Sequence, residues 1–148
     1  MYRIVLFVHV FSVVALLGPT YLGPALAKLR GNPPSPVILR VETVMCRYGA
    51  AFFVVGLLSG LWLIWLSPFV PDFGEARWLH TALGLFFIAA GIVTGFILPR
   101  VNKAAVAAEG GDAAEASRLM APVDAVAGPV VGLLTAVILY LMLTKPWS

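Results

Sequence analysis

The 148-residue chain is 61% hydrophobic and 11% charged, with a net charge of +3 and a mean hydropathy of +0.97. A soluble domain carries about 25% charged residues, so this chain lacks the polar residues that would cover a water-exposed surface. Its basic residues lie in short segments between apolar blocks, which excludes a nucleic-acid-binding patch. Its single cysteine, Cys46, excludes an internal disulfide and cysteine-based metal clusters.

Four apolar blocks are each long enough to cross a bilayer, for which about 20 residues suffice. We place these spans at about 4–26, 45–66, 78–99 and 123–144. Each span must be a helix, because every backbone N–H and C=O in lipid needs a partner within the protein. The sequence therefore predicts one integral membrane domain over residues 1–148, folded as an all-α antiparallel bundle of four transmembrane helices.

The connections between the spans contain helix signals of their own. Ser35 before Pro36 fits an N-cap followed by proline at the first helical position, so we expect the second helix to begin near Pro36. Asp112 and Glu115 have the spacing of a capping box. This spacing predicts a short amphipathic helix that leads into the last span.

Several polar and helix-breaking residues lie in or beside the spans. Pro19 and Pro24 in the first span and Pro129 in the last each remove a backbone hydrogen bond and are expected to bend their helices. Bundle shaping is the favoured interpretation of these bends, and a bend that lines a cavity is the alternative. Glu42 is expected among lipid headgroups, and Asp124 as an acid favoured by the dipole of the last helix.

The basic residues predict how the bundle is oriented. The first and third connections, with their membrane ends, hold seven basic residues, whereas the opposite side holds three. The seven are Lys28, Arg30, Arg40, Arg47, Arg100, Lys103 and Arg118, and the three are Arg3, Arg77 and Lys145. Because basic residues are enriched in cytoplasmic connections, both termini are expected outside, in a bacterial inner membrane.

The chain has two histidines, His9 and His80, each expected one to two helical turns below the same outer face. Ionisable side chains within spans are usually functional or paired. Ser12 lies one turn from His9 and is expected to orient its ring. His80 shares a helical stripe with three glycines and one phenylalanine, and the glycines leave room for a flat ligand or a close helix. The stripe consists of Gly84, Phe87, Gly91 and Gly95.

We expect spans one and three to lie diagonally across the bundle, at a separation that suits two imidazoles reaching one metal centre. A haem b iron with His9 and His80 as axial ligands is the expected occupant. Arg3 and Arg77 lie near the outer rim and are candidates for pairing with propionates. A copper ion on the two histidines is a smaller alternative, and purely structural histidines are the alternative without a cofactor.

Three segments carry a family resemblance: LFVHVFSVVALLGP, WLHTALGLFFIAAGIVTGFILPRVNK and LYLMLTKPW. They resemble an uncharacterised bacterial family of four-helix membrane proteins, distantly related to the CopD membrane domain and to the haem-binding protoporphyrinogen oxidase HemJ. The resemblance covers nearly the whole chain and implies a histidine-lined site for haem b or copper, with His9 matching the first-helix histidine. The spans lack a clear lysine partner, since Lys145 follows the last span, so the oxidase activity is not carried over.

The leading prediction is a b-type haem protein for one-electron transfer, acting as a carrier or as a subunit of a larger membrane complex rather than as an enzyme. The first alternative is a cofactor-free accessory subunit that packs against other membrane proteins or a second copy through glycine-rich helix faces. The glycine pairs are Gly56/Gly60, Gly91/Gly95 and Gly128/Gly132. A copper-handling protein ranks third, because Met142 is the only outer-side sulfur ligand in a span.

Overall fold

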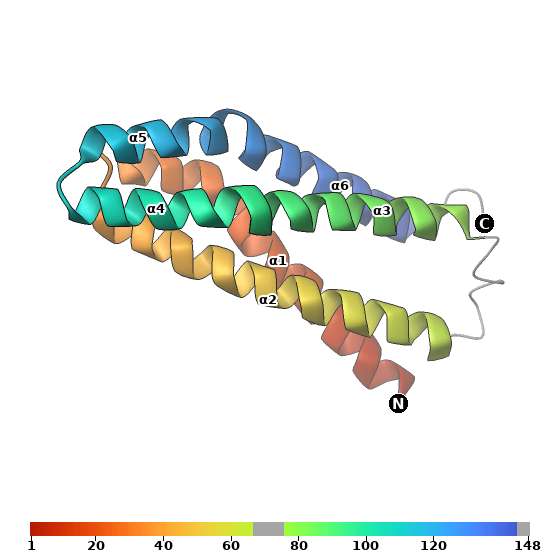
Figure 1. Ribbon diagram of the computed structural model, residues 1–148. Coiled ribbons are helices and arrows are strands. Elements are labelled where there is room, and N and C mark those ends of the chain that lie inside the picture. Colours follow the sequence, from red (N-terminus) through yellow and green to blue (C-terminus); the bar gives the residue numbers. More distant parts are fainter. Residues whose placement is uncertain (67–75, 145–148) are drawn as a thin grey trace.

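The computed structural model describes residues 1–66 and 76–144. Within these residues every regular element is a helix, and four helical segments are long and apolar enough to cross a membrane. They run antiparallel as a bundle (Figure 1), which confirms the predicted fold class. Lys145, which contributes to the predicted orientation, lies outside the described residues.

The first two spans are uninterrupted α-helices, whereas the third and fourth each contain a π-helical turn. The first span is α1, Tyr2–Arg30, and the second is α2, Pro36–Leu66. The third consists of α3, Arg77–Ile92, the π-helix η1, Val93–Ile97, and α4, Leu98–Glu109. The fourth consists of α5, Ala113–Pro122, the π-helix η2, Val123–Ala127, and α6, Gly128–Thr144.

The helix starts that the sequence predicts are confirmed at two places. Helix α2 begins at Pro36, and the carbonyl of Ser35 accepts the first intrahelical hydrogen bond from the Leu39 N–H at 3.1 Å. Asp112 caps α5 by accepting a hydrogen bond of 2.9 Å from the backbone N–H of Glu115. Both ends lie outside the apolar blocks, so the helices are longer than the spans expected from hydropathy.

Each π-helix ends two residues before a proline. Helix η1 ends at Ile97 before Pro99, and η2 ends at Ala127 before Pro129. A proline ring clashes with the carbonyl four residues earlier and removes one backbone hydrogen bond. That carbonyl lies within the π-turn in both spans, so the wider turn accommodates the ring. The prolines thus explain why the two irregular turns occur at these positions.

The helices pack around the bundle in a closed order. Helix α1 packs along α2, α2 packs against α4, α3 packs against α6, and α6 returns to α1. The first and third spans therefore lie diagonally opposite each other, as the sequence analysis expects. In Figure 1, α2 and α3 diverge toward the end of the bundle where α1 begins. We call this end, where α6 also finishes, the termini side, and the opposite end the turn side.

Glycines of α2 allow α1 to pack closely against this helix. A Cβ atom added to Gly49 would lie 3.9 Å from the Pro19 side chain, and one added to Gly56 would lie 3.7 Å from the Ser12 side chain. Further along, a Cβ atom on Gly60 would lie 3.0 Å from Cε1 of His9. Gly56 and Gly60 therefore pack against α1 within the bundle, and this contact places His9 against α2.

The outer surface of the bundle is apolar. Leu29, Leu58, Leu133 and Leu143 come from three of the four spans, and each is more than 60% exposed. Alanine and valine make up most of the buried core, and Leu39, Phe53 and Met120 are among its larger residues. A lipid environment requires an apolar exterior, and four helices are long and apolar enough to cross a membrane. The chain is therefore a multi-pass membrane protein.

Candidate functional site

The bundle contains two cavities of similar size, one toward each end. The termini-side cavity has a volume of about 580 Å³ and is lined by all four spans, including Tyr2, His9, Gly60, Leu79 and Met142. The turn-side cavity has a volume of about 560 Å³ and includes Pro24, Glu42, Cys46, Ile97 and Asp124 in its lining. Both volumes lie within the range of small-molecule and cofactor sites. Leu16 and Phe53 line both cavities and therefore separate them.

His9 is held against α2 by its Nδ1 atom. This nitrogen lies 3.0 Å from the backbone carbonyl oxygen of Gly56 and 3.3 Å from the hydroxyl oxygen of Ser59. The Ser59 hydroxyl donates its own proton to the Val55 carbonyl at 2.6 Å, which leaves its oxygen free to accept. The ring is half-buried and lines the termini-side cavity.

These contacts determine the tautomer of His9. A carbonyl oxygen only accepts hydrogen bonds, so Nδ1 must carry the proton that it donates to Gly56. The neutral ring then has its lone pair on Nε2, and no described residue forms a hydrogen bond with that atom. Metal-ligating histidines commonly donate their second ring N–H to a backbone carbonyl, and His9 meets this condition.

Gly60 is needed for this arrangement. We expect Gly60→Ala to destabilise the α1–α2 contact by about 1–3 kcal/mol, because its Cβ atom would lie 3.0 Å from the His9 ring and force the ring off the Gly56 carbonyl. Gly56→Ala is the matched control, since its Cβ atom would meet Ser12 at an ordinary 3.7 Å. Thermal unfolding in detergent measures both, and equal melting temperatures for the two variants would contradict the predicted position of the ring.

The other predicted site residues lie apart from this ring. The Ser12 hydroxyl is buried but donates to the Val8 carbonyl at 2.7 Å, so Gly56 and Ser59, and not Ser12, orient His9. His80 is exposed and does not line the termini-side cavity, although its neighbours Trp78 and Leu79 do. The described structure therefore does not bring the two histidines into one cavity, and their joint ligation of a metal stays a prediction.

The glycine stripe beside His80 faces outward. Gly84 and Gly91 are exposed, and an added Cβ atom at either position would meet no atom within 4 Å. Arg3 and Arg77 are also exposed, one residue from the cavity-lining Tyr2 and Trp78, respectively. The two arginines lie near the rim of the termini-side cavity, whereas the glycine stripe forms an open face on the outside of the bundle.

The turn-side cavity has a charged wall that the sequence analysis missed. Nη2 of Arg30 donates to both carboxylate oxygens of Asp124 at 2.8 Å, and Nε of Arg30 lies 3.6 Å from Oε1 of Glu42. Arg30 is 4% exposed and Glu42 is 8% exposed, although both were expected near the membrane surface. In the sequence, the only sign of this triad is that its three charged residues lie at the inner ends of their spans. No rule of sequence spacing predicts that residues 30, 42 and 124 meet.

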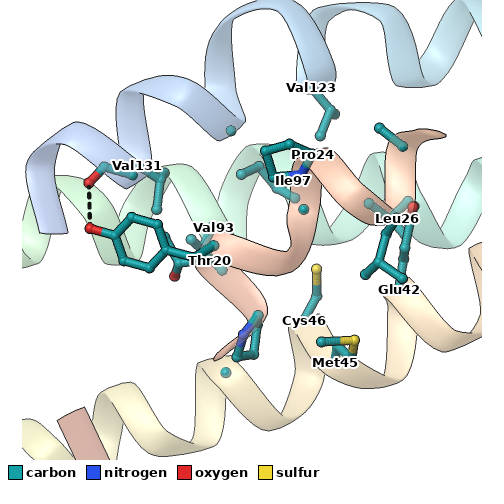
Figure 2. A pocket seen from close by; sticks show the side chains of 18 of the residues that line it. Thr20, Pro24, Leu26, Glu42, Met45, Cys46, Val93, Ile97, Val123 and Val131 are labelled. Carbon is teal, nitrogen blue, oxygen red and sulfur yellow. Dashed lines mark hydrogen bonds between the residues drawn. The ribbon is translucent and has the colours of Figure 1, made fainter. Parts of the chain in front are cut away.

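Figure 2 shows how the turn-side cavity is enclosed. Cys46 points from α2 toward Pro24 of α1, with Met45 beside it along α2, while Ile97 lies behind Pro24 and Val123 lies above it. Glu42 stands to one side, close to Leu26. Both π-helices contribute to the lining, η1 through Val93 and Ile97 and η2 through Val123 and Asp124. Irregular turns of this kind frequently occur at functional sites.

Comparison of the chain with protein-family models, curated proteins and solved structures gives no match. Among the described residues, no cluster of three or more histidine, cysteine, aspartate or glutamate side chains could hold a metal ion. A haem group needs only one or two protein ligands, so a haem site does not require such a cluster.

Proposed function

We propose that this protein binds haem b in the termini-side cavity, where Nε2 of His9 would hold the iron, and functions in one-electron transfer. The observation that supports the proposal is the hydrogen bond of 3.0 Å from Nδ1 of His9 to the Gly56 carbonyl. This hydrogen bond requires the ring proton to be on Nδ1. Nε2 then keeps the lone pair that a ligand of a haem iron must donate. Two further small or polar residues, Ser59 and Gly60, fit the ring into α2.

The chemistry of the cavity wall fits a haem group. Apart from His9, its lining is dominated by aliphatic and aromatic side chains such as Leu57, Leu83, Phe86 and Ile138. Such walls bury the macrocycle and exclude water, which are the conditions under which a membrane-embedded haem is retained. Arg3 and Arg77, exposed near the rim, are the proposed partners of the propionates.

His80 would be the second residue that holds the iron. It directly follows Leu79, a lining residue of α3, and lies on the span diagonally opposite His9. Met142 already lines the same cavity and is the competing candidate. The two assignments differ in a measurable way, because a methionine ligand raises the reduction potential of the haem relative to two histidines.

A bound haem supplies reversible one-electron oxidation and reduction at its iron. The residues of this chain hold it, exclude water from it and set its potential through the ligand field. The orientation in this proposal places both termini and the haem at the outer side of a bacterial inner membrane. A carrier of this size exchanges electrons with a partner, so we propose that it works as a subunit of, or beside, a larger membrane complex.

The absorption spectrum of the protein purified from haem-supplied cells tests this proposal. We expect a Soret band with sharp bands on reduction, corresponding to one haem per chain by pyridine haemochrome assay. Absence of a Soret band at any haem supply would contradict the haem proposal. Metal analysis of the same sample would then distinguish a copper protein, in which His9 and Met142 would supply ligands, from a protein without a cofactor.

A second candidate is an accessory subunit without a cofactor, favoured by the open glycine stripe of the third span. Gly84, Gly91 and Gly95 present no neighbour within 4 Å of an added Cβ atom, so another helix can approach closely there. Replacing Gly91 with leucine is expected to dissociate such a complex while leaving the fold of the chain intact. A complex that is lost in this variant, together with a wild-type protein that shows no Soret band, would favour this candidate over the haem protein.

A further inference from the structure

The termini-side cavity lies between two pairs of helices, α1 with α2 and α3 with α6. On the turn side, polar contacts join these pairs, and Arg30 of α1 binds Asp124 of η2 at 2.8 Å. Further along, the Tyr21 hydroxyl donates to the Gly132 carbonyl oxygen of α6 at 3.5 Å. Among the described residues, no hydrogen bond or ion pair joins α1 to α6 on the termini side of Tyr21. Polar contacts therefore hold these two helices together only toward the turn side.

The first half of α1 follows α2 and leaves α6. His9 and Ser12 pack against glycines of α2, which hold this half of the helix in place. In Figure 1 the start of α1 lies beyond α2, on the side away from α6. The same half of α1 nevertheless lines the termini-side cavity together with α6. One wall of the cavity is thus formed by two helices that diverge.

The exposure of the lining side chains shows on which side the cavity is open. Val10 of α1 and Leu143 of α6 both line the cavity, yet they are 51% and 82% exposed. Trp78 and Leu79 of α3 line it as well but are 7% and 5% exposed, and Ile64 of α2 packs against them. Side chains therefore cover the cavity between α2 and α3 but leave a gap between α1 and α6. We call this gap the lateral opening.

The lateral opening faces the acyl chains of the bilayer. No charged residue occurs in α1 between Arg3 and Lys28, and none occurs in α6. Uncharged segments of this length lie in the hydrocarbon core, which is about 30 Å thick. Leu6 and Val14, two further exposed residues that line the cavity from α1, are also apolar. A molecule that dissolves in lipid can therefore pass through the lateral opening without contact with water.

We propose that the termini-side cavity takes up its ligand from the bilayer through the lateral opening, and that a phospholipid acyl chain fills this opening until the ligand binds. The inference rests on the proposed haem site for the identity of the ligand. A largely apolar macrocycle partitions into lipid and reaches His9 from the side of the bundle. An apolar gap in contact with fluid lipid does not stay empty, because an unfilled gap loses the packing contacts that an acyl chain provides.

Contact between lipid and the cavity wall tests the lateral opening without haem. Leu17 lines the cavity and is half-buried, so bimane attached to Leu17→Cys reports on the cavity interior. Cys46→Ser removes the other thiol of the chain. In nanodiscs of phosphatidylcholine brominated on its acyl chains, we expect the bimane fluorescence to be quenched relative to nanodiscs of unbrominated lipid.

Two matched pairs of substitutions locate the route. Val10→Phe with Val14→Phe adds bulk at the lateral opening and should reduce this quenching. Val130→Phe with Val137→Phe is the control, because both valines are exposed on α6 and line neither cavity, and it should leave the quenching unchanged.

The same pairs without the bimane label test uptake of the ligand. With haem supplied in phosphatidylcholine vesicles, the pair at the lateral opening should slow the rise of the Soret band by about 10-fold. Its final absorbance should equal that of the wild-type protein, which shows that the site itself is intact. The control pair should load at the wild-type rate.

Two results would overturn the proposal. Absence of bimane quenching by brominated lipid would show that the cavity is closed to the bilayer. Equal quenching, or equal haem uptake, in the two paired variants would show that the route does not pass between α1 and α6. If the wild-type protein binds no haem, the quenching experiment still tests the opening, so the two proposals fail separately.

Discussion

Replacing Arg30 with glutamine is expected to lower the free energy of unfolding by about 3 kcal/mol or more. The substitution removes the single cation that lies between Glu42 and Asp124, and Glu42 is 8% exposed. An uncompensated carboxylate in an apolar wall is destabilising because little water reaches it. The triad also connects the turn-side ends of α1, α2 and η2, so its loss loosens three spans together. Denaturation in mixed micelles measures the change.

Two further variants show whether the loss of the Arg30 charge causes the destabilisation. Arg40→Gln breaks the exposed pair with Glu109 at the same end of the bundle, and we expect it to leave the unfolding curve nearly unchanged. The triple variant Arg30→Gln, Glu42→Gln and Asp124→Asn replaces all three charges with neutral groups of similar shape and should recover most of the lost stability. If the triple variant is as unstable as Arg30→Gln alone, lost packing of the arginine stem is the cause.

Replacing His9 with alanine is expected to weaken haem binding by at least about 100-fold. Loss of an outer hydrogen-bond partner of a metal ligand already costs about 10- to 100-fold, and loss of the ligand itself costs more. The substitution also leaves a space beside Gly60 that the imidazole ring filled. Haem titration of the purified protein, followed at the Soret band, measures the affinity.

The space left by the ring provides a control for misfolding. Added imidazole should enter it and restore the Soret band of the His9→Ala variant. His80→Ala should retain haem through His9 but change the iron from low spin to high spin, because the sixth ligand is lost. Full and unshifted haem binding by His9→Ala would remove His9 from the site, and the same result for His80→Ala would transfer the second position to another residue such as Met142.

The fold was predictable from the sequence because hydropathy acts on whole segments. In lipid, a segment of about 20 apolar residues can form all of its backbone hydrogen bonds only as a helix. Four such blocks therefore predict four antiparallel helices, whichever apolar side chains they carry. The start of α2 at Pro36 and the cap of α5 at Asp112 were predictable because both depend on residues within one turn. A disturbed helix was expected at Pro129, but its π-helical form and the π-helix before Pro99 were not predicted.

The candidate sites were less predictable because they depend on how one helix is rotated against another. His9 was recognisable as an ionisable residue in a span, but its contact with Gly56 and Ser59 depends on the register of α1 against α2. The outward direction of His80 depends on the rotation of α3, which an all-apolar helix does not reveal. The meeting of Arg30, Glu42 and Asp124 likewise requires three spans to be placed at once.

The position of the iron is best determined in a structure of the haem-loaded protein by cryo-electron microscopy in nanodiscs. We expect this structure to show the macrocycle in the termini-side cavity. Its iron should be bonded to Nε2 of His9, while Nδ1 keeps its hydrogen bond to the Gly56 carbonyl. Density for haem at another location, or an iron ligated in this cavity by residues other than His9, would contradict the account.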